Sequence, residues 1–342
     1  MDRTTHTTMR AMVIERTGGP EQLVVADVPY PQRVNAEVLV RVVAAGVNRF
    51  DLETRAGRGD SDAIPSFPAV LGHDFSGVVV ETPYAAHPLS PGDAVYGMAP
   101  CPRSGGSYAE YISVPSLSVA RKPATLSHLE AAAVPLAALT AWGMVVDVAK
   151  AHEGQRLLIN AGAGGVGHFA VQFASYFGAH VVATGSRDNS AWLRELGAAE
   201  VVDYGAADVD RSVRQVDVVI NLVDDDVEAD RSLRLLRAGG LAVHAPLASG
   251  PAFARKAAQA GVRSTGFAVS PDGATLAVIS RLLDSGDVHV YVDEVYDLAD
   301  ARDAHTRLER SHTRGKLVLR VADDRGRLTR SPPGSVAWSR YA

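Results

Sequence analysis

The stretch Ala161-Gly162-Ala163-Gly164-Gly165-Val166-Gly167 decides how the second half of this chain folds. It follows the apolar run Arg156–Asn160, which predicts a buried strand, and it opens the run Val166–Phe177, which predicts a helix. Its glycines have the G-x-G-x-x-G spacing, which allows a tight turn, a close approach of the backbone to a pyrophosphate, and close packing of helix on strand. The stretch therefore predicts a dinucleotide site with the phosphates at the helix N-terminus, and a glycine-rich turn without a ligand is the alternative.

The end of the next predicted strand, His180–Thr184, indicates which dinucleotide binds. NAD sites usually place an acidic residue there, roughly 20 residues after the glycines, to bind the ribose 2′-hydroxyl. This chain has Ser186 and Arg187 instead, and a guanidinium without an acid favours the 2′-phosphate of NADPH. Both residues are predicted to bind the cofactor, with Tyr204 stacking beside its adenine end. A solvated Arg187 and a Tyr204 that only packs are the alternatives.

The predicted elements divide the 342 residues into two domains, because one ordinary core does not hold so many. In 1–126, prolines are dense and branched runs such as Val38–Val43 predict a β-rich domain without long helices. In 127–268, strands alternate with helices, which predicts a doubly wound α/β domain with a parallel sheet. Residues 269–321 return to the first domain, and 322–342 are expected to form a loosely ordered tail.

Apolar periodicity predicts the further elements of 127–321. The predicted strands are His180–Thr184, Glu200–Val202, Val216–Asn221, Leu241–His244, Val292–Val295 and Lys316–Val321. The predicted helices are Ser190–Leu196, Ala229–Leu236, Ala274–Leu283 and Ala299–Arg310.

Composition excludes several classes of protein. Thirty-four Lys and Arg against 39 Asp and Glu give a net charge of −5, which offers nucleic acid no basic field. The longest apolar run, Glu130–Asp147, contains Pro135 and Thr140, falls short of the roughly 20 residues of a membrane span, and predicts a buried helix. The single cysteine, Cys101, excludes an intrachain disulfide and any zinc site with two thiolates. With no signal-peptide core in Met1–Thr8, we expect a reducing, cytoplasmic location.

Other catalytic motifs fail on their spacing. His168 follows the glycines where a Walker A loop has Lys and then Ser or Thr. His152 opens no H-E-x-x-H motif, because Arg156 stands where the second histidine belongs. Ser76 and Ser107 each miss a flanking glycine of the G-x-S-x-G elbow, which excludes that type of serine hydrolase.

Several ordered motifs resemble the medium-chain dehydrogenase/reductase superfamily, and within it the zinc-free branch of quinone reductases and enoyl reductases. The resemblance runs from about Met9 to about Val321 and implies a GroES-like catalytic domain with a Rossmann domain inserted before its last elements. It also implies a homodimer. The motifs are Ala45–Asp51, Pro68–Val79, Pro91–Gly97, Gly106–Tyr111, Leu139–Trp142, Ala161–Gly167, Leu196–Ala198, Val202–Tyr204 and Gly315–Leu319.

The resemblance also bears on metal binding. Zinc-dependent relatives have a cysteine at the position of Asn48 and a paired histidine at that of His73, which Asp74 follows here. An amide is a poor substitute for a thiolate on zinc. The region 97–105, where those relatives carry four cysteines, keeps only Cys101. We therefore predict no metal site and a hydrogen-bonded His73, and a zinc ion at His73 is the alternative.

These observations predict an NADPH-dependent reductase of an activated C=C bond, as in an enone or enoyl group, or of a quinone. Hydride transfer to such a substrate builds negative charge on a carbonyl oxygen, which then needs a hydrogen-bond donor. Asn48 and Thr140 are the candidates for contact with substrate and cofactor, and water supplies the final proton. Glu53 stands where many relatives have a tyrosine, proposed in some as the proton donor, and is the candidate acid. The resemblance further assigns to the cofactor His244, Phe267 and Lys316.

Plainer interpretations of several residues stay open. Glu53 is otherwise a surface residue, and the triplet Asp224-Asp225-Asp226 is a solvated turn or else a cation or substrate contact. The loops Glu53–Pro65 and Ala245–Phe267 are expected to shape the substrate pocket, with charged residues such as Arg55 at its entrance or merely solvated. His244 and Phe267 are otherwise packing residues. The alternative functions are a zinc-dependent alcohol dehydrogenase and an NADPH-binding protein with little turnover.

Overall fold

The computed structural model describes residues 7–102, 105–205, 214–223, 225–245, 251–310 and 313–322. The chain forms two compact units. The first comprises Met1–Leu136, Ser270–Gly286 and Val290–Ala342, and the second comprises Ala137–Val269 and Asp287–His289. Residues 127–136, which the alternation of strands and helices assigned to the second domain, belong to the first unit. The expected tail from 323 onward and Asp224 lie outside the described residues.

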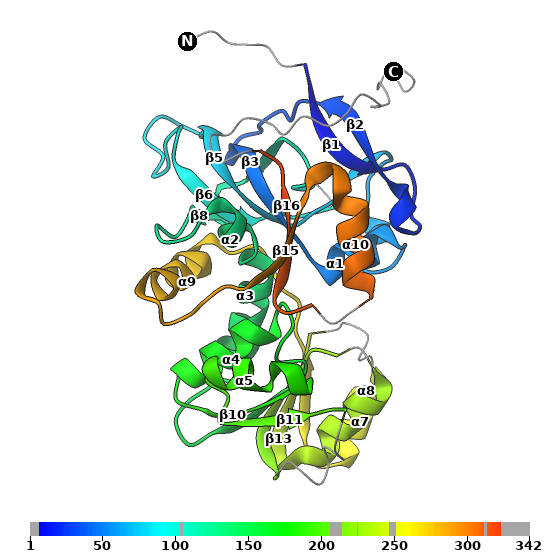
Figure 1. The fold of residues 1–342 in the computed structure, drawn as a ribbon, viewed down its shortest axis with the longest axis vertical. Coiled ribbons are helices and arrows are strands. Elements are labelled where there is room, and N and C mark those ends of the chain that lie inside the picture. Colours follow the sequence, from blue (N-terminus) through cyan, green and yellow to red (C-terminus); the bar gives the residue numbers. More distant parts are fainter. Residues whose placement is uncertain are drawn as a thin grey trace. The chain divides into compact units, whose positions relative to one another are not determined.

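The first unit is built on two β-sheets (Figure 1). Apolar side chains of both sheets, among them Ile14, Val40 and Phe75, form a large buried core cluster, and a smaller cluster that includes Met9 and Val28 lies on β1 and β2. The smaller sheet has the order β2 (Leu23–Pro29), β1 (Thr8–Ile14), β4 (Ala69–Val70). The larger sheet has the order β15 (Val292–Asp297), β16 (Lys316–Arg320), β3 (Glu37–Val47), β5 (Asp74–Glu81), β6 (Ala94–Met98), β8 (Val119–Arg121), and β7 (Tyr111–Pro115) also pairs with β3.

Short helices connect these strands, as the dense prolines predict. α1 (Arg49–Arg55) begins directly after β3, with Asn48 as its N-cap residue. α10 (Ala301–Glu309) packs on α1 and β16 (Figure 1). This unit also contains the α-helices α2 (His128–Ala132) and α9 (Gly273–Ser285). The turn from β3 into α1 therefore lies beside β16 and α10, and these elements carry the polar residues described below.

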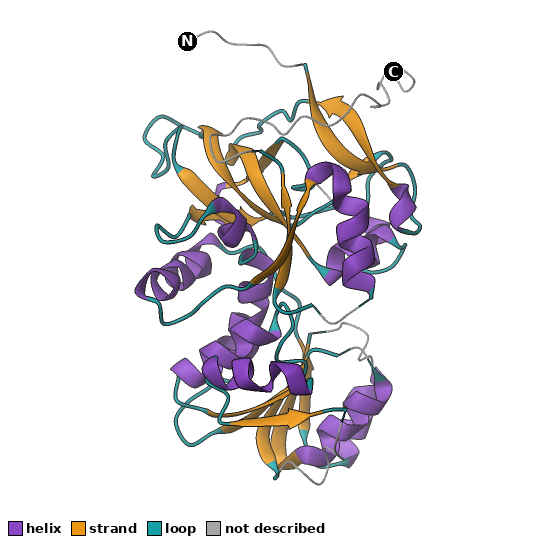
Figure 2. Cartoon of the chain, viewed as in Figure 1, coloured by secondary structure: helices purple, strands orange, loops and turns teal. Residues whose placement is uncertain are grey.

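The second unit contains a six-stranded parallel sheet with helices on both faces (Figure 2). The strand order is β11 (Glu200–Asp203), β10 (His180–Gly185), β9 (Arg156–Ile159), β12 (Val216–Asn221), β13 (Leu236–His244), β14 (Arg263–Gly266). The helices are α4 (Gly167–Tyr176), α5 (Ser190–Glu195), α7 (Asp226–Leu235) and α8 (Pro251–Gln259). The predicted Rossmann arrangement is confirmed. The order reverses between β9 and β12, and in such sheets ligands bind outside the carboxyl ends of the strands at this point.

Sequence and structure differ in a few elements. The apolar run Glu130–Asp147 is divided among α2, α3 (Pro135–Trp142) and a π-helix (Gly143–Val148), because Pro135 begins a helix but does not continue one. α8 and β14 have no counterpart among the predicted elements, since β14 is a polar edge strand without apolar alternation. No helix in the described part of the chain is long and apolar enough to cross a bilayer.

Candidate functional site

The glycine stretch connects β9 to α4 in the second unit. Ala161 adopts a φ of 52°, and the Gly162 N–H donates to the Thr184 carbonyl at 2.8 Å, which ties the loop to β10. A Cβ on Gly167 would lie 2.2 Å from the carbonyl oxygen of Ala161, whereas a Cβ on Gly164 would meet only that oxygen, at 3.3 Å. The third glycine is thus required for packing, and the second borders open space that fits the pyrophosphate of a dinucleotide.

The carboxyl ends of β10 and β11 carry the residues predicted to select the cofactor. Ser186 directly follows β10 and is half-buried, and Arg187 and Tyr204 are exposed. The acid at the end of neighbouring β11, Asp203, accepts a hydrogen bond from the Gly205 N–H at 2.9 Å. An exposed guanidinium after β10, with no acid at the end of that strand, fits a ribose 2′-phosphate.

Four buried polar side chains, Asn160, Asn221, Ser232 and His244, form what we call the strand-end cluster, beside the carboxyl ends of β9, β12 and β13. Asn160 Nδ2 lies 3.4 Å from both Asn221 Oδ1 and Ser232 Oγ, and Asn221 Nδ2 lies 3.3 Å from His244 Nδ1. His244 Nε2 and Asn160 Oδ1 have no hydrogen-bond partner among the described residues. Burial lowers the pKa of His244 to about 4. The sequence prediction named only His244. An asparagine at the end of a buried strand was the signal for Asn160 and Asn221, whereas Ser232, on α7, has no such signal.

Phe267 and Thr140 also belong to the second unit. The Phe267 N–H donates to the carbonyl of His244 at 2.8 Å, directly after β14. A Cβ on Gly143 would come within 2.0 Å of the Phe267 ring, so the ring packs on the π-helix where a glycine leaves room. Thr140 is buried on α3. Contact of either residue with a cofactor stays a prediction.

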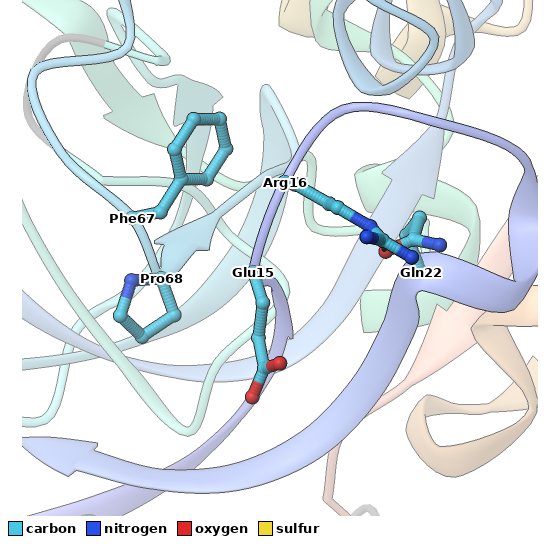
Figure 3. Close-up of a pocket in the computed structure, with 5 residues that line it drawn as sticks. All are labelled: Glu15, Arg16, Gln22, Phe67 and Pro68. Carbon is cyan, nitrogen blue, oxygen red and sulfur yellow. Dashed lines mark hydrogen bonds between the residues drawn. The ribbon is translucent and has the colours of Figure 1, made fainter.

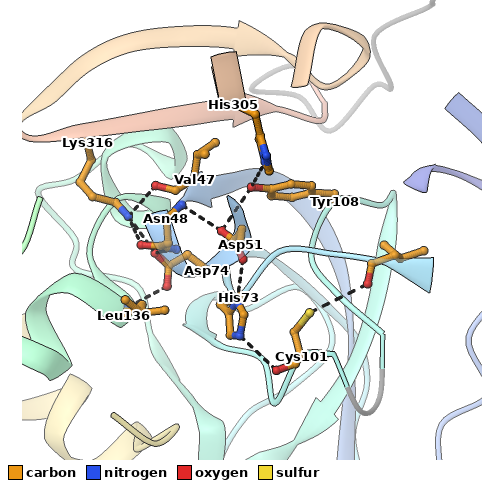
Figure 4. A network of polar contacts seen from close by, with 11 residues as sticks. Val47, Asn48, Asp51, His73, Asp74, Cys101, Tyr108, Leu136, His305 and Lys316 are labelled. Atoms are coloured by element: carbon orange, nitrogen blue, oxygen red, sulfur yellow. Dashed lines mark hydrogen bonds and ion pairs between the residues drawn. The ribbon is translucent and has the colours of Figure 1, made fainter. Parts of the chain in front are cut away.

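In the first unit, Asn48 is held by two charged groups, as Figure 4 shows. Lys316 Nζ donates to Asn48 Oδ1, to the Val47 carbonyl at 3.0 Å and to Asp74 Oδ2 at 3.3 Å. Asn48 Nδ2 donates to Asp74 Oδ2 at 3.0 Å, and Asp74 Oδ1 accepts from the Leu136 N–H at 2.7 Å. The orientation of the amide is therefore fixed, and its second Nδ2 proton has no acceptor among the described residues. We call Asn48, Asp74 and Lys316 the Asn48 cluster.

A second buried group adjoins it through Asp51 (Figure 4). Asp51 Oδ2 accepts from the backbone N–H of Asn48 at 2.9 Å, which caps α1. Asp51 Oδ1 lies 2.6 Å from His73 Nδ1, and His73 Nε2 lies 3.1 Å from the carbonyl oxygen of Cys101. Because a carboxylate and a carbonyl oxygen only accept, both nitrogens of His73 donate and its ring is an imidazolium.

Arg55 sets the direction of the remaining hydrogen bonds. Its Nη1 lies 3.3 Å from His305 Nδ1, and because a guanidinium only donates, this nitrogen accepts. His305 Nε2 therefore carries the proton and donates to Tyr108 Oη at 3.1 Å, and Tyr108 donates to Asp51 Oδ2 at 3.3 Å. Arg55 is 2% exposed and also pairs with Glu309 on α10. Arg55, His305, Tyr108, Asp51 and His73 thus form one directed chain, which we call the Asp51 chain.

Burial and charge oppose each other at these residues. Burial raises the pKa of Asp51, but His73, His305 and the Asn48 N–H together act against it and the pKa is lowered. Burial likewise lowers the pKa of His73, but Asp51, Asp74 and the Cys101 carbonyl together act against it and the pKa is raised. Burial raises the pKa of Asp74, although Lys316 acts against it. Burial lowers the pKa of His305 to about 3, which agrees with a neutral ring.

Two predicted site residues are engaged elsewhere. Glu53, on α1, pairs with Arg58. Lys316, assigned to the cofactor, gives its protons to Val47, Asn48 and Asp74 within the first unit. Arg55, expected at a pocket entrance, is buried in the Asp51 chain, and part of the Ala245–Phe267 loop lies outside the described residues.

Figure 3 shows a surface pocket of about 270 Å³ in the first unit. It is lined by Glu15, Arg16, Gln22, Phe67 and Pro68, and none of them belongs to either buried group. Among the described residues, no three or more His, Cys, Asp or Glu side chains are arranged to hold a metal ion.

Known proteins resemble this chain over most of its length. The alcohol dehydrogenase GroES-like domain family matches residues 34–124, and the zinc-binding dehydrogenase family matches 196–319. A mitochondrial NAD(P)H oxidoreductase of Danio rerio is 30% identical, over 93% of this chain and 92% of that protein. A chloroplastic NADPH-dependent alkenal/one oxidoreductase of Arabidopsis thaliana is 31% identical, over 91% and 79%. The solved quinone oxidoreductase of Coxiella burnetii has a TM-score of 0.87 and 34% identity, over 92% and 99%.

Proposed function

Because this chain belongs to the medium-chain dehydrogenase/reductase superfamily, we propose that it is an NADPH-dependent oxidoreductase acting on an activated C=C bond or a quinone. One observation carries the choice of reaction: an amide, not a thiolate, stands at Asn48, and a buried lysine and carboxylate orient it. The names of the relatives, which include an alkenal/one oxidoreductase and a quinone oxidoreductase, support the same class of substrate.

The second unit supplies the cofactor site. When bound, NADPH supplies the hydride. The loop Gly162–Gly167 would hold its pyrophosphate, Ser186 and Arg187 its 2′-phosphate, and Tyr204 its adenine. Thr140 and Phe267 are proposed to border the nicotinamide half.

Asn48 is proposed as the donor to the oxygen that becomes negative. Its amide is fixed by Lys316 on the oxygen side and by Asp74 on the nitrogen side, which leaves one N–H for the substrate. The ammonium of Lys316 also draws electrons from the amide and strengthens that remaining donor. We therefore revise the role of Lys316 from cofactor binding to positioning Asn48. With Glu53 paired to Arg58, water is the proposed source of the final proton.

We propose that the reaction needs no zinc. A zinc-binding histidine must offer a ring lone pair, but both nitrogens of His73 donate, to Asp51 and to the Cys101 carbonyl. The position of the zinc thiolate is taken by the Asn48 amide, whose oxygen accepts from Lys316. The family that matches residues 196–319 is described as zinc-binding. In this chain, however, Asn48 and His73, at the two zinc-ligand positions, are hydrogen-bonded to other groups.

We also propose a homodimer and a cytoplasmic location. β14 is an edge strand with mostly exposed residues, and such an edge can pair with a second copy. A gel-filtration mass of one chain would refute the dimer. A buried, unpaired Cys101 is compatible with a reducing compartment.

The direct test follows NADPH oxidation with a panel of enones and quinones, before and after treatment with a chelator. We expect turnover that the chelator does not reduce and a zinc content far below one per chain. Loss of activity with the chelator, restored by zinc, would favour the alcohol dehydrogenase. Tight NADPH binding without oxidation would favour a binding protein.

A further inference from the structure

The strand-end cluster fixes which nitrogen of His244 carries the proton. The backbone N–H of Val223 donates to Asn221 Oδ1 at 3.1 Å, so this side of the amide is its oxygen. The other side, Nδ2, therefore faces His244 Nδ1 at 3.3 Å and donates to it. His244 Nδ1 is an acceptor, and the neutral ring keeps its proton on Nε2.

This Nε2–H group has no acceptor among the described residues. The side chain is 1% exposed, so bulk water does not supply one. The ring of Phe253, which lies at 78° to the imidazole with 4.0 Å between centroids, packs against His244 without offering an oxygen or nitrogen. Buried donors are nearly always paired in native proteins, so a donor without a partner is a place where a bound group can supply the acceptor.

The position of His244 indicates which part of a dinucleotide it meets. The glycine loop after β9 takes the pyrophosphate, and Ser186 and Arg187 after β10 take the ribose phosphate on the adenine side. The nicotinamide half then lies on the other side of the reversal in strand order, over the ends of β12 and β13. His244 is the last residue of β13.

We propose that His244 binds the nicotinamide carboxamide, with its Nε2–H donating to the carboxamide oxygen. The inference rests on the proposed use of NADPH and adds the residue that orients its reactive ring. The cluster lacks one acceptor, for His244 Nε2, and one donor, for Asn160 Oδ1. A primary carboxamide carries one of each.

Equilibrium binding of NADPH and of 2′,5′-ADP, which lacks the nicotinamide half, tests the proposal. His244→Met keeps an apolar side chain and removes the donor. We expect it to weaken NADPH binding about tenfold and to leave 2′,5′-ADP binding unchanged. The matched control is His180→Gln, at the exposed start of β10, which should change neither. Equal NADPH affinity in His244→Met and the unchanged protein would overturn the inference.

The same titrations separate this proposal from the proposed function. If the unchanged protein binds neither NADPH nor 2′,5′-ADP, the use of NADPH is wrong. Should His244→Met fail to fold, nitrogen NMR of the unchanged protein decides, because it reports which ring nitrogen is protonated. We expect a protonated Nε2 whose signal moves with NADPH and not with 2′,5′-ADP. A proton on Nδ1, or no response to NADPH, would contradict the proposal.

Discussion

The buried polar groups described in the two units differ in how completely their hydrogen bonds are made. In the first unit, every nitrogen and oxygen atom of the side chains of the Asn48 cluster and the Asp51 chain has a partner, and directions are fixed by Lys316 and Arg55. In the second unit, the strand-end cluster leaves His244 Nε2 and Asn160 Oδ1 without one. A complete network holds its members in place, whereas a buried atom without a partner can form a hydrogen bond with a ligand. The first unit is therefore proposed to position one donor, and the second to bind the cofactor.

The largest effect is expected where the first network loses a charge. Lys316→Met leaves Asp74 buried without its cation and should lower the free energy of unfolding by about 3–5 kcal/mol, measured by urea denaturation. Adding Asp74→Asn removes the stranded charge and should restore most of the stability. The double variant should still turn over slowly, because the amide of Asn48 has lost its polarising partner. Full activity in the stable double variant would show that Lys316 has only a structural role.

The second prediction removes the donor and keeps both charges. Asn48→Leu should lower kcat/KM by roughly 10²–10³, the usual cost of losing one donor to a developing oxyanion. Lys316 and Asp74 still pair, so the thermal midpoint should change far less than in Lys316→Met. Glu53→Gln, on the same helix, is the matched control and should stay within twofold. A loss in Glu53→Gln as large as in Asn48→Leu would instead make Glu53 the proton donor.

The third prediction concerns a substitution that interrupts the hydrogen bonds of the Asp51 chain. Tyr108→Phe leaves His305 Nε2–H without its acceptor and should cost about 1–3 kcal/mol of stability. Asp51 still accepts from His73 and from the Asn48 N–H, so kcat/KM should fall only severalfold. A fall as large as that of Asn48→Leu would show that the Tyr108 hydroxyl itself reaches the substrate.

The two groups also differ in how far the sequence predicts them. Strand–helix alternation and the glycine spacing are local, and they correctly predict the Rossmann sheet. The Asp51 chain joins Arg55 to His305, which are 250 residues apart, and no local pattern signals such a contact. His305 lies on a helix of mostly polar residues, a pattern that predicts a solvent-exposed helix. The packing of α10 on α1 buries His305, and the sequence pattern does not show this packing. Asp51 and Tyr108 stand inside matched motifs, but their roles follow only from the fold.

The smallest effect is expected in how the stability of the fold depends on pH, to which the buried histidines contribute. Burial lowers the pKa of His244 from 6.5 to about 4, so below pH 6.5 the unfolded chain binds a proton that the folded chain refuses. Its contribution to stability is complete above pH 6.5 and falls as the pH drops, by about 1 kcal/mol near pH 5.5. The pKa of His305 is also lowered, so its contribution to stability likewise falls as the pH drops. The pKa of His73 is raised, so its contribution instead falls as the pH rises. His244→Met should therefore flatten the decline in this window without abolishing it. An unchanged slope in denaturation midpoints would mean that His244 accepts a proton as readily in the folded protein, and the directed hydrogen bond from Asn221 would then be wrong.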